Sequence, residues 1–356
     1  MSELTLMKGN EALAEAAVRA GCKCFFGYPI TPQTEVAAYL SKRMPKVGGV
    51  FLQAESEIAA INMIYGCAGT GIRCMTSSSS PGISLKTEGI SYITGADLPC
   101  VIINVQRGGP GLGGIQPSQA DYWQVTRALG HGDFHVLVFA PSTVQEMADT
   151  VTKAFDLADK YRMPAVILAD GLLGQMMEPV AFDDNAVIKM SDASQKPWAA
   201  TGHGNKRKHN IINSLYLQAN ELEAKIRERF ERYEKVKAAE TMAVTYKTED
   251  ADIIVTAYGS TARLAKSAVD AARKEGIKVG LFRPVTLWPY PERELRDCCK
   301  NAEKVLVVEM SMGQMIDDVK LSLNCALPVE FVGRTGGVIP SPAEILAKIK
   351  EIGGKD

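Results

Sequence analysis

Short apolar runs in the first half of the chain alternate with segments long enough to form helices. The runs expected to form strands cover residues 22–26, 50–53, 73–77, 100–106, 135–139 and 165–169, and a helix is expected over residues 8–20. Neighbouring parallel strands need a crossover segment between them, and that segment is usually a helix. The alternation therefore predicts the α/β fold class, with a parallel sheet wrapped by helices.

The alternation is interrupted once and then resumes, which divides the chain of 356 residues into two domains. Residues 1–180 are expected to form the first domain, 181–250 a linker, and 251–356 a smaller second α/β domain. Within the linker we predict a charged amphipathic helix over residues 211–239, because apolar side chains recur there at helical spacing. Its acidic and basic residues nearly cancel, which favours a surface helix over membrane binding.

Charge and hydropathy exclude two classes of partner. The chain has 40 Lys and Arg against 41 Asp and Glu, so no basic surplus is available to neutralise a nucleic-acid backbone. No run approaches the roughly 18 apolar residues of a membrane-spanning helix. Residues 1–5 have neither the basic nor the apolar region of a secretion signal. We therefore expect a soluble cytoplasmic protein with no nucleic-acid and no membrane partner.

The chain has eight cysteines, but their spacing does not suit a metal centre. Cys22 and Cys24 are one residue apart, Cys298 and Cys299 are adjacent, and the others are scattered through apolar stretches. Ligated iron–sulfur clusters and zinc sites use closely repeated C-x₂-C spacing, which this sequence lacks. We predict buried, reduced thiols and no metal ligands in this chain, so that any iron–sulfur cluster is held by another subunit.

Special chemistry is concentrated in four segments that each follow an expected strand. They cover residues 26–32, 53–60, 75–82 and 105–121. Ligands of open α/β sheets bind at the carboxyl ends of the strands. We therefore expect the four segments to meet at one edge of the first sheet and to form the functional site.

The first of these segments is expected to form a rigid turn. Pro29 and Pro32 each fix a backbone angle, so the turn presents Thr31 at the mouth of the site. A purely structural alternative makes Thr31 the N-cap of the following helix and Pro32 its first residue. The sequence leaves both interpretations open.

The second and third segments supply a carboxylate and several hydroxyls. Glu57 begins a run of apolar residues that is expected to form a buried helix. The helix dipole stabilises a carboxylate at this position without any function, but a buried carboxylate needs a partner. Ser79 lies in a serine-rich turn that ends in Pro-Gly. Such a turn offers hydroxyls and backbone amides to a polar ligand, although it is also a common helix cap.

The fourth segment joins Arg107 to a glycine-rich loop. An arginine at a strand end can hold a carboxylate with two parallel hydrogen bonds, so Arg107 is a candidate substrate ligand; a surface ion pair is the structural alternative. Gly109, Gly111 and Gly114 formally satisfy the dinucleotide fingerprint G-x-G-x-x-G. Pro110 interrupts that fingerprint, so a mobile loop behind Arg107 is favoured over a nicotinamide site, which stays an alternative.

These motifs together resemble a known family. The sequence YPITP at 28–32, followed at these intervals by Ser56-Glu57 and by Arg107, resembles the α-type subunit of the 2-oxoacid:ferredoxin oxidoreductases. The resemblance continues in KGNEA at 8–12, FRPVTLWP at 282–289 and EMSMGQ at 309–314, and it covers nearly the whole chain. Chain length and residues 207–215 are most similar to the branched-chain member, which acts on 3-methyl-2-oxobutanoate; the 2-oxoglutarate member is the alternative.

The resemblance implies a fold and a set of site residues. The first domain corresponds to a thiamine-diphosphate pyrimidine-binding domain, and the second to the C-terminal domain of transketolase. Glu57 matches the carboxylate that contacts the aminopyrimidine ring, with Tyr28, Pro29 and Ser79 as further cofactor contacts. Thr31 and Arg107 match residues that hold the carbonyl and carboxylate of the substrate.

The resemblance also implies cofactors and partners. The reaction is the oxidative decarboxylation of a 2-oxoacid to an acyl-CoA, with thiamine diphosphate as cofactor, coenzyme A as co-substrate and ferredoxin as electron acceptor. The nearest approach to a Gly-Asp-Gly diphosphate motif is Ala169-Asp170-Gly171, and no suitably spaced Asn follows it. Thiamine diphosphate is therefore expected to be shared with a β-type subunit that binds Mg²⁺. A γ-type subunit and a ferredoxin-like δ-type subunit complete the expected assembly, with [4Fe-4S] clusters on the partners. A non-catalytic scaffold subunit remains a further alternative.

Overall fold

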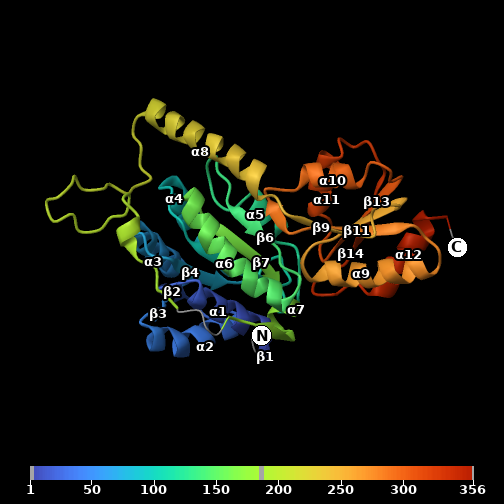
Figure 1. Cartoon of the computed structure of the whole chain (residues 1–356), viewed down its shortest axis with the longest axis horizontal. Coiled ribbons are helices and arrows are strands. Elements are labelled where there is room, and N and C mark those ends of the chain that lie inside the picture. Colours follow the sequence, from blue (N-terminus) through green and yellow to red (C-terminus); the bar gives the residue numbers. More distant parts are fainter. Residues whose placement is uncertain (1–3, 184–187, 355–356) are drawn as a thin grey trace.

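Two mainly parallel sheets, each covered by helices and each with one antiparallel edge strand, lie next to one another along the long axis of the molecule (Figure 1). The computed structural model describes residues 4–183 and 188–354. Residues 1–3, which belong to the segment tested for a secretion signal, lie outside the described residues. No helix in the described ranges is long and apolar enough to cross a membrane.

The first sheet has seven strands in the order β12-β6-β7-β5-β4-β2-β3. Its strands are β2 (Cys24–Gly27), β3 (Val50–Gln53), β4 (Cys74–Ser78), β5 (Val101–Gln106), β6 (Leu137–Phe139), β7 (Ala165–Asp170) and β12 (Thr286–Trp288). Six of them are the runs predicted from the sequence, and all six pair in parallel. The predicted α/β class is therefore confirmed, since each pair of parallel strands is joined through helix-containing crossovers.

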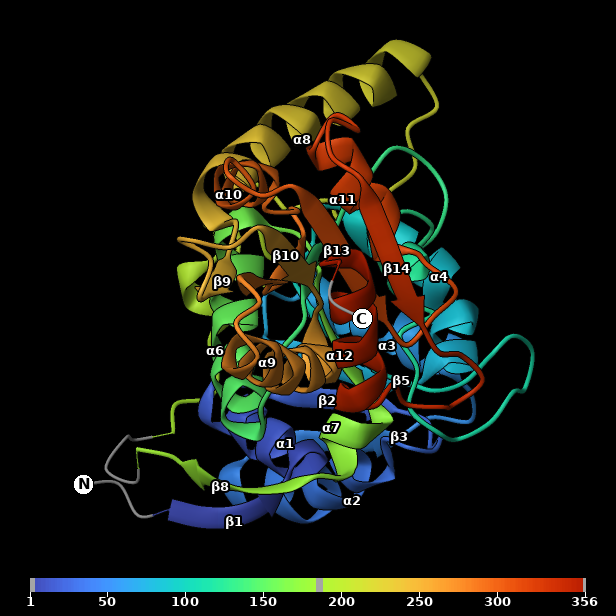
Figure 2. The same ribbon diagram turned by 90° about the vertical axis from the view of Figure 1, so that its right-hand side faces the viewer.

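Helices cover this sheet and pack against each other in pairs, α1 on α6 and α3 on α4. The helices are α1 (Gly9–Arg19), α2 (Thr34–Arg43), α3 (Glu57–Gly69), α4 (Ser80–Gly95), α5 (Tyr122–Thr126), α6 (Val144–Tyr161) and α7 (Gly171–Gln175), with the 3₁₀ turn η1 (Met44–Val47). The strands β1 (Leu4–Lys8) and β8 (Met177–Ala181) form a separate antiparallel ribbon near the N-terminus (Figure 2).

The second sheet has five strands in the order β14-β13-β10-β11-β9. These are β9 (Ala243–Tyr246), β10 (Ile253–Thr256), β11 (Val279–Pro284), β13 (Lys304–Glu309) and β14 (Val329–Gly333), and the helices are α9 (Gly259–Lys274), α10 (Glu292–Cys298), α11 (Met315–Ser322) and α12 (Pro342–Ile352). The two regions exchange strands. β9 comes from the expected linker range and joins the second sheet, whereas β12 comes from the second range and pairs antiparallel with β6 of the first.

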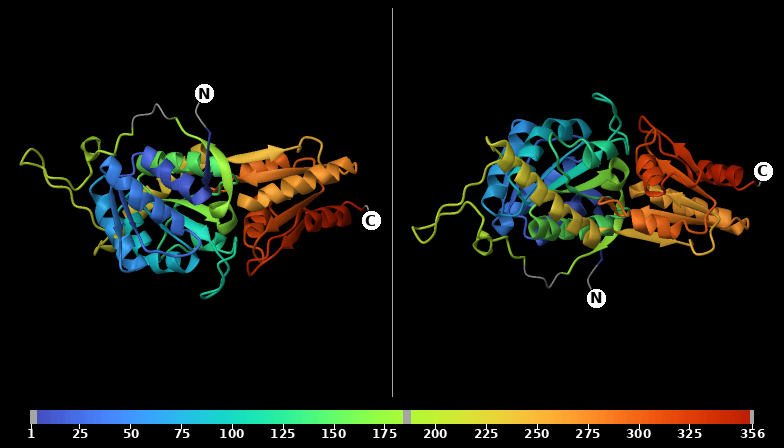
Figure 3. Two further views of the ribbon diagram at one scale, coloured as in Figure 1. Left: turned by 90° about the horizontal axis from the view of Figure 1, so that it is seen from below. Right: turned by 90° about the horizontal axis from the view of Figure 1, so that it is seen from above.

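The connection between the regions is half extended chain and half helix. Its helix, α8 (Ala219–Glu240), begins eight residues later than the predicted start at 211, after the 3₁₀ turn η2 (Ala193–Gln195) and a long irregular stretch (Figure 3). The amide of Leu215 donates to Asn213 Oδ1, and Asn210 Nδ2 donates to Pro197 O. Such side-chain bonds to the backbone compete with helix formation, which explains the later start.

The cysteines only partly follow the expectation of burial. No disulfide is formed between the eight cysteines, all of which lie in the described ranges, and Cys325 is exposed. Burial raises the pKa of Cys100 to about 12, so this thiol stays protonated at neutral pH. The exposed Cys325 is a correction to the sequence prediction, since it follows a short helix at the surface and not a core strand.

Candidate active site

The four polar segments meet at one edge of the first sheet. The strands that lead into them, β5, β4, β2 and β3, are consecutive neighbours in the sheet and all run parallel. Their carboxyl ends therefore lie side by side, as the sequence predicted. This edge is where an open α/β sheet binds its ligand.

The turn after β2 is fastened to the end of β4 through a buried glutamine. Gln33 donates from Nε2 to Tyr28 O at 3.3 Å, and its Oε1 accepts from Ser77 Oγ at 2.6 Å. Helix α2 begins at Thr34 with Gln33 in the N-cap position, so the alternative in which Thr31 caps this helix is wrong. Tyr28, Pro29 and Thr31 are all exposed along the turn, where they can contact a ligand.

Glu57 is the first residue of α3 and is only 6 % exposed. The Ser56 hydroxyl caps the helix by accepting from Ala59 N at 3.2 Å, which leaves the Glu57 side chain free for another role. Within the described part of the chain, no hydrogen bond reaches the Glu57 carboxylate. The helix itself is buried on one side only, because Ile58 is 50 % exposed. The expectation of a buried helix is therefore confirmed for one face only, and an apolar side chain faces out beside the carboxylate.

A glycine on α4 makes room for this carboxylate. A Cβ at Gly82 would lie 2.1 Å from Ser78 Oγ and 2.6 Å from Glu57 Oε1. Any larger residue would displace one of these groups, so α3, α4 and the end of β4 can meet this closely only because residue 82 is glycine. The Ser78 and Ser79 hydroxyls are buried and have no hydrogen-bond partner among the described residues. The Glu57 carboxylate and the Ser78 hydroxyl, both with unused hydrogen-bonding capacity, thus meet at Gly82.

Arg107 closes the other side of the site. Its Nη1 donates to Thr31 O at 3.0 Å and its Nη2 to Leu112 O at 3.1 Å, so it links the turn after β2 to the glycine-rich loop. Its Nε is buried without a partner. Arg107 is only 7 % exposed and forms no ion pair with the described carboxylates, so its interpretation as a surface ion pair is wrong. The structure therefore brings Thr31 and Arg107 into direct contact.

The glycine-rich loop lacks the geometry of a dinucleotide site. Residues 109–116 are exposed, and the loop returns to the sheet where Arg107 bridges Pro117. The next helix, α5, begins only at Tyr122. A dinucleotide fingerprint places its last glycine at the start of a helix whose N-terminus receives the phosphates. The loop does not lead directly into a helix, so the nicotinamide alternative has no structural support.

One buried charge near Glu57 was missed in the sequence. Lys86 lies one turn after Gly82 on α4 and is fully buried. Its Nζ donates to Thr76 Oγ1 at 2.7 Å and to Ser77 O at 3.1 Å. Burial lowers the pKa of Lys86 to about 7, although the nearby Glu57 carboxylate acts to raise it. The sequence did contain a signal for this burial. Lys86 lies at helical spacing from the apolar residues Ile83, Ile90 and Ile93, which places it on the same buried face of the helix.

A cavity of about 630 Å³ adjoins the site at Thr31. Pro32, Ile115, Pro117, Leu172, Met176 and Ile339 form its apolar lining. Its one ionisable lining residue is Glu35, which accepts hydrogen bonds from Lys8, Asn10 and Gln175. Burial opposes ionisation, but these hydrogen bonds hold the pKa of Glu35 below its usual range. The described lining is therefore mainly apolar, and the Glu35 carboxylate at its wall is paired with the Lys8 ammonium at 3.0 Å.

Asp170 belongs to the segment whose sequence most nearly matches a diphosphate-binding motif, and its side chain forms hydrogen bonds at the interface between the two regions. Its Oδ1 accepts from the amides of Leu172 and Leu173 at the start of α7, and its Oδ2 accepts from Ser260 Oγ at 2.6 Å. Burial raises the pKa of this carboxyl, while those hydrogen bonds act to lower it. The Asp170 oxygens are occupied by protein donors, so the first domain offers no Mg²⁺-binding carboxylate at this position.

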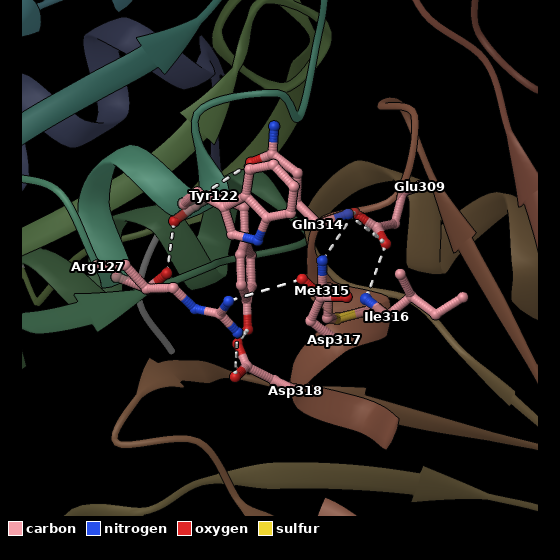
Figure 4. A network of polar contacts seen from close by, with 10 residues as sticks. Tyr122, Arg127, Glu309, Gln314, Met315, Ile316, Asp317 and Asp318 are labelled. Atoms are coloured by element: carbon pink, nitrogen blue, oxygen red, sulfur yellow. Dashed lines mark hydrogen bonds and ion pairs between the residues drawn. The ribbon is translucent and has the colours of Figure 1, made fainter. Parts of the chain in front are cut away.

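The same interface contains a second polar network, drawn in Figure 4. Tyr122 donates to Asp318 at 2.5 Å and Arg127 pairs with the same carboxylate at 2.8 Å, which joins α5 to α11. Glu309 at the end of β13 accepts from the amides of Gln314, Met315 and Ile316 at the start of α11. The contacts of Tyr122 and Arg127 with Asp318 join the second region to the first, and the Glu309 bonds hold the start of α11 within the second region.

Comparisons with known proteins agree with this geometry. Residues 15–245 match the family described as "Pyruvate flavodoxin/ferredoxin oxidoreductase, thiamine diP-bdg", and residues 251–345 match "Pyruvate:ferredoxin oxidoreductase core domain II". The chain is 49% identical over 350 residues to the ketoisovalerate oxidoreductase subunit VorB of Methanothermobacter marburgensis, covering 98% of each chain. It is 35% identical over 373 residues to the 2-oxoglutarate synthase subunit KorA of the same organism, covering 98% of this chain and 99% of that one.

Solved structures show the same relationship. A 2-oxoglutarate:ferredoxin oxidoreductase from Magnetococcus marinus, solved with 2-oxoglutarate, coenzyme A and succinyl-CoA bound, superposes with a TM-score of 0.84 at 26% identity. The match covers 98% of this chain but 65% of that longer chain. A split-gene transketolase superposes with a TM-score of 0.59 at 14% identity, which shows a shared fold. With both domains matched and close relatives along its whole length, the chain belongs to the 2-oxoacid:ferredoxin oxidoreductase family.

Proposed function

We propose that this chain is a catalytic subunit of a 2-oxoacid:ferredoxin oxidoreductase and supplies the pyrimidine-binding half of a thiamine-diphosphate site. The observation that carries the proposal is a group of buried side-chain atoms at one sheet edge, Ser78 Oγ, Ser79 Oγ and Arg107 Nε, that have no hydrogen-bond partner among the described residues, together with the buried Glu57 at the same edge. Unpaired buried polar groups are costly, so a fold retains them where a ligand completes their hydrogen bonds.

The residues present fit the aminopyrimidine end of this cofactor. Glu57 presents a carboxylate to a ring nitrogen, while Ser79 adds a hydroxyl and Tyr28 with Pro29 adds a surface for the ring. A carboxylate that shares a proton with the ring favours its imino form. When bound, thiamine diphosphate supplies the carbanion chemistry that decarboxylation requires. The role of Glu57 is then to hold one proton at the ring nitrogen.

Thr31 and Arg107 are the proposed substrate ligands. A guanidinium that already has Nη1 and Nη2 on carbonyl oxygens keeps its orientation, and its Nε–H has no acceptor among the described residues, so it is left for one from a ligand. The carboxylate of a 2-oxoacid is such an acceptor. Thr31 lines both the site and the adjoining cavity, so its hydroxyl can contact the keto oxygen while the substrate side chain enters the cavity.

The cavity favours a branched aliphatic substrate over 2-oxoglutarate. Its apolar lining suits the side chain of 3-methyl-2-oxobutanoate. A second substrate carboxylate would find no cation among the described lining residues, since the Lys8 ammonium beside the cavity is already paired with Glu35 at 3.0 Å. The higher identity to the ketoisovalerate relative supports the same choice. The proposed reaction forms the branched-chain acyl-CoA and CO₂ and reduces ferredoxin.

A β-type partner is proposed to complete the site. Asp170 is engaged within the chain, so the Mg²⁺ and diphosphate ligands have to come from elsewhere. Ile58 on α3 and Leu85 on α4 are each 50 % exposed beside Glu57, which provides an apolar margin for a covering subunit. The [4Fe-4S] clusters are assigned to partners, among which a γ-type and a ferredoxin-like δ-type subunit are proposed.

The proposal is tested with the assembled complex and two substrates. We expect kcat/KM for 3-methyl-2-oxobutanoate to exceed that for 2-oxoglutarate by about 10²-fold or more, since a buried unpaired charge costs about 3 kcal/mol. Replacing Arg107 by Met should raise KM for the 2-oxoacid far more than it lowers kcat. Equal turnover of both substrates would remove the branched-chain assignment, and an unchanged KM in the Arg107 variant would remove the carboxylate contact.

A further inference from the structure

Lys86 has no role in the site as described so far, although it is the buried amine next to Glu57. Gly82 and Lys86 are four residues apart on α4, so they lie on the same face of the helix. A helical side chain leans towards the N-terminus of its helix, which directs the Lys86 stem towards Gly82. Because residue 82 has no side chain, the face that Lys86 approaches is the one that Glu57 Oε1 and Ser78 Oγ occupy.

The amine is held by β4 and not by a carboxylate. Its two bonds go to neutral acceptors, Thr76 Oγ1 at 2.7 Å and Ser77 O at 3.1 Å. A buried ammonium without an ion pair is costly, and the electrostatic effect of Glu57 is what partly offsets that cost. The protonation of Lys86 is thus linked to the charge on Glu57.

The other charged groups nearby are engaged elsewhere. Strand β5 contributes none, since its sequence is VIINVQ. Asp121 accepts from Ser80 Oγ and Asn104 Nδ2 at the start of α4. Arg107 bonds to the turn and the loop, and Glu88 lies on the exposed side of α4. Glu57 is therefore the charge to which Lys86 responds.

We propose that Lys86 is a positioning residue that stores a proton while the site is empty and releases it when Glu57 comes to share a proton with a bound ring nitrogen. This inference rests on the proposed function of Glu57. In the empty site the charge of Glu57 favours the ammonium form of Lys86. In the occupied site Lys86 loses one proton to solvent and becomes a neutral amine, while Glu57 and the ring nitrogen together take one proton from solvent, so the net proton uptake is small.

The size of the effect depends on pH. Because burial lowers the pKa of Lys86 to about 7, Lys86 carries its proton in a larger share of the empty sites at pH 6.5 than at pH 8.5. Replacing Lys86 by Met removes the stored proton. The variant complex should then take up more protons per thiamine diphosphate bound than the wild type at pH 6.5, by up to about one. At pH 8.5 the two should take up the same number.

The measurement is titration calorimetry of the complex, freed of cofactor, with thiamine diphosphate and Mg²⁺ in buffers of different ionisation enthalpy. Lys86→Gln is the second variant, because it keeps an N–H donor for Thr76 and Ser77 but has no charge. Thr94→Val is the matched control: Thr94 is buried on the same helix and donates to Ile90 O at 2.9 Å, away from Glu57. Both Lys86 variants should show the additional proton uptake, and the control should not.

Equal proton uptake by wild type and both Lys86 variants at pH 6.5 would overturn the inference. If neither variant assembles, the wild-type complex decides alone: its proton uptake should change between pH 6 and 8.5 with a midpoint near 7, and a profile without that change overturns the inference. Glu57→Gln separates the two proposals. If turnover is near normal in that variant, the proposed function is wrong. If turnover is lost, but wild type and the Lys86 variants take up equal numbers of protons on binding thiamine diphosphate, only the proposed role of Lys86 is wrong.

Discussion

Buried polar groups are found both at the domain interface and at the sheet edge, but the hydrogen bonding of these groups differs between the two places. At the interface, Gln119 donates from Nε2 to Tyr258 O at 2.9 Å, and its Oε1 accepts from Thr261 Oγ1 at 2.7 Å and from Met310 N at 3.0 Å. At the sheet edge, the hydroxyls of Ser78 and Ser79 have no partner.

This contrast suggests a structural role for the bonded groups at the interface and a functional role for the unbonded groups at the sheet edge. A buried polar network whose members are all bonded fixes a unique packing of its surroundings. A buried group left unbonded lowers stability, and the Ser78 and Ser79 hydroxyls lie at the sheet edge, where a ligand from outside the chain can complete their hydrogen bonds. Changes at the interface should therefore affect stability, and changes at the sheet edge should affect activity.

Glu57→Gln should give the largest loss. The amide keeps the size of the side chain but cannot hold a proton in the way a carboxylate does, so decarboxylation by the complex should fall by about 10³-fold with an unchanged melting temperature. Glu55→Gln is the control, because Glu55 is exposed two residues earlier. If the free energy of unfolding fell by as much as the transition-state free energy of the reaction rose, Glu57 would have a structural role.

Gly82→Ala and Gly89→Ala form a matched pair on α4, two turns apart. A Cβ at Gly82 would lie 2.6 Å from Glu57 Oε1, whereas one at Gly89 would lie 2.6 Å from Ile61 Cγ2 in the core. We expect Gly82→Ala to lower kcat/KM by about 10²-fold, because Glu57 has to move. Gly89→Ala should mainly lower the free energy of unfolding, by about 1–3 kcal/mol. Activity assays and urea unfolding of both variants check this, and the reverse pattern would break the contrast.

Gln119→Leu tests the interface. The substitution leaves the Thr261 hydroxyl, Met310 amide and Tyr258 carbonyl without their partner, so the free energy of unfolding should fall by about 2 kcal/mol. Activity per folded complex should change little. Urea unfolding provides the measurement, with Gln218→Leu at an exposed position as control. An unchanged unfolding midpoint would show that the network adds nothing to stability.

Glu146→Gln should give the smallest effect and a pH dependence. Burial opposes ionisation, but the bidentate pair with Arg283 and the bonds from Ser142 hold the pKa of Glu146 below its usual range. Such a carboxyl stabilises the fold above its unfolded pKa of about 4.3, and this stability is lost as the pH falls through the lower folded value.

The variant should therefore lose about 1 kcal/mol of unfolding free energy at pH 7, and its difference from wild type should shrink below about pH 4.3. Urea unfolding at several pH values measures this. Glu234→Gln on the surface of α8 is the control. A difference that grows on acidification would contradict the assigned sign.

The strand pattern and the location of the site could be predicted from the sequence because they depend on local spacing. Six apolar runs gave six parallel strands, and the parallel direction alone placed Glu57 and Arg107 at one edge. The start of α8 could not be predicted, because side-chain bonds of Asn210 and Asn213 outweigh the helical periodicity. The exchange of β9 and β12 between sheets also depends on tertiary pairing that local spacing does not encode.

Within the site, residue types were easier to predict than environments. The contact of Arg107 with Thr31 follows from the adjacency of β5, β4 and β2, but the atom that stays unbonded depends on side-chain geometry. Lys86 was missed because a lysine in a helix is usually exposed. Its burial depends on acceptors from β4, Thr76 Oγ1 and Ser77 O, which local helical spacing does not reveal.

The central claim is that this chain holds one half of an active site whose other half lies on a β-type partner. The most direct measurement is CoA-dependent decarboxylation of 3-methyl-2-oxobutanoate, with ferredoxin as acceptor, by this chain alone, by the complex lacking it, and by the reconstituted complex. We predict turnover only in the reconstituted complex. Full-rate turnover by the complex that lacks this chain would contradict the account and make the chain a scaffold.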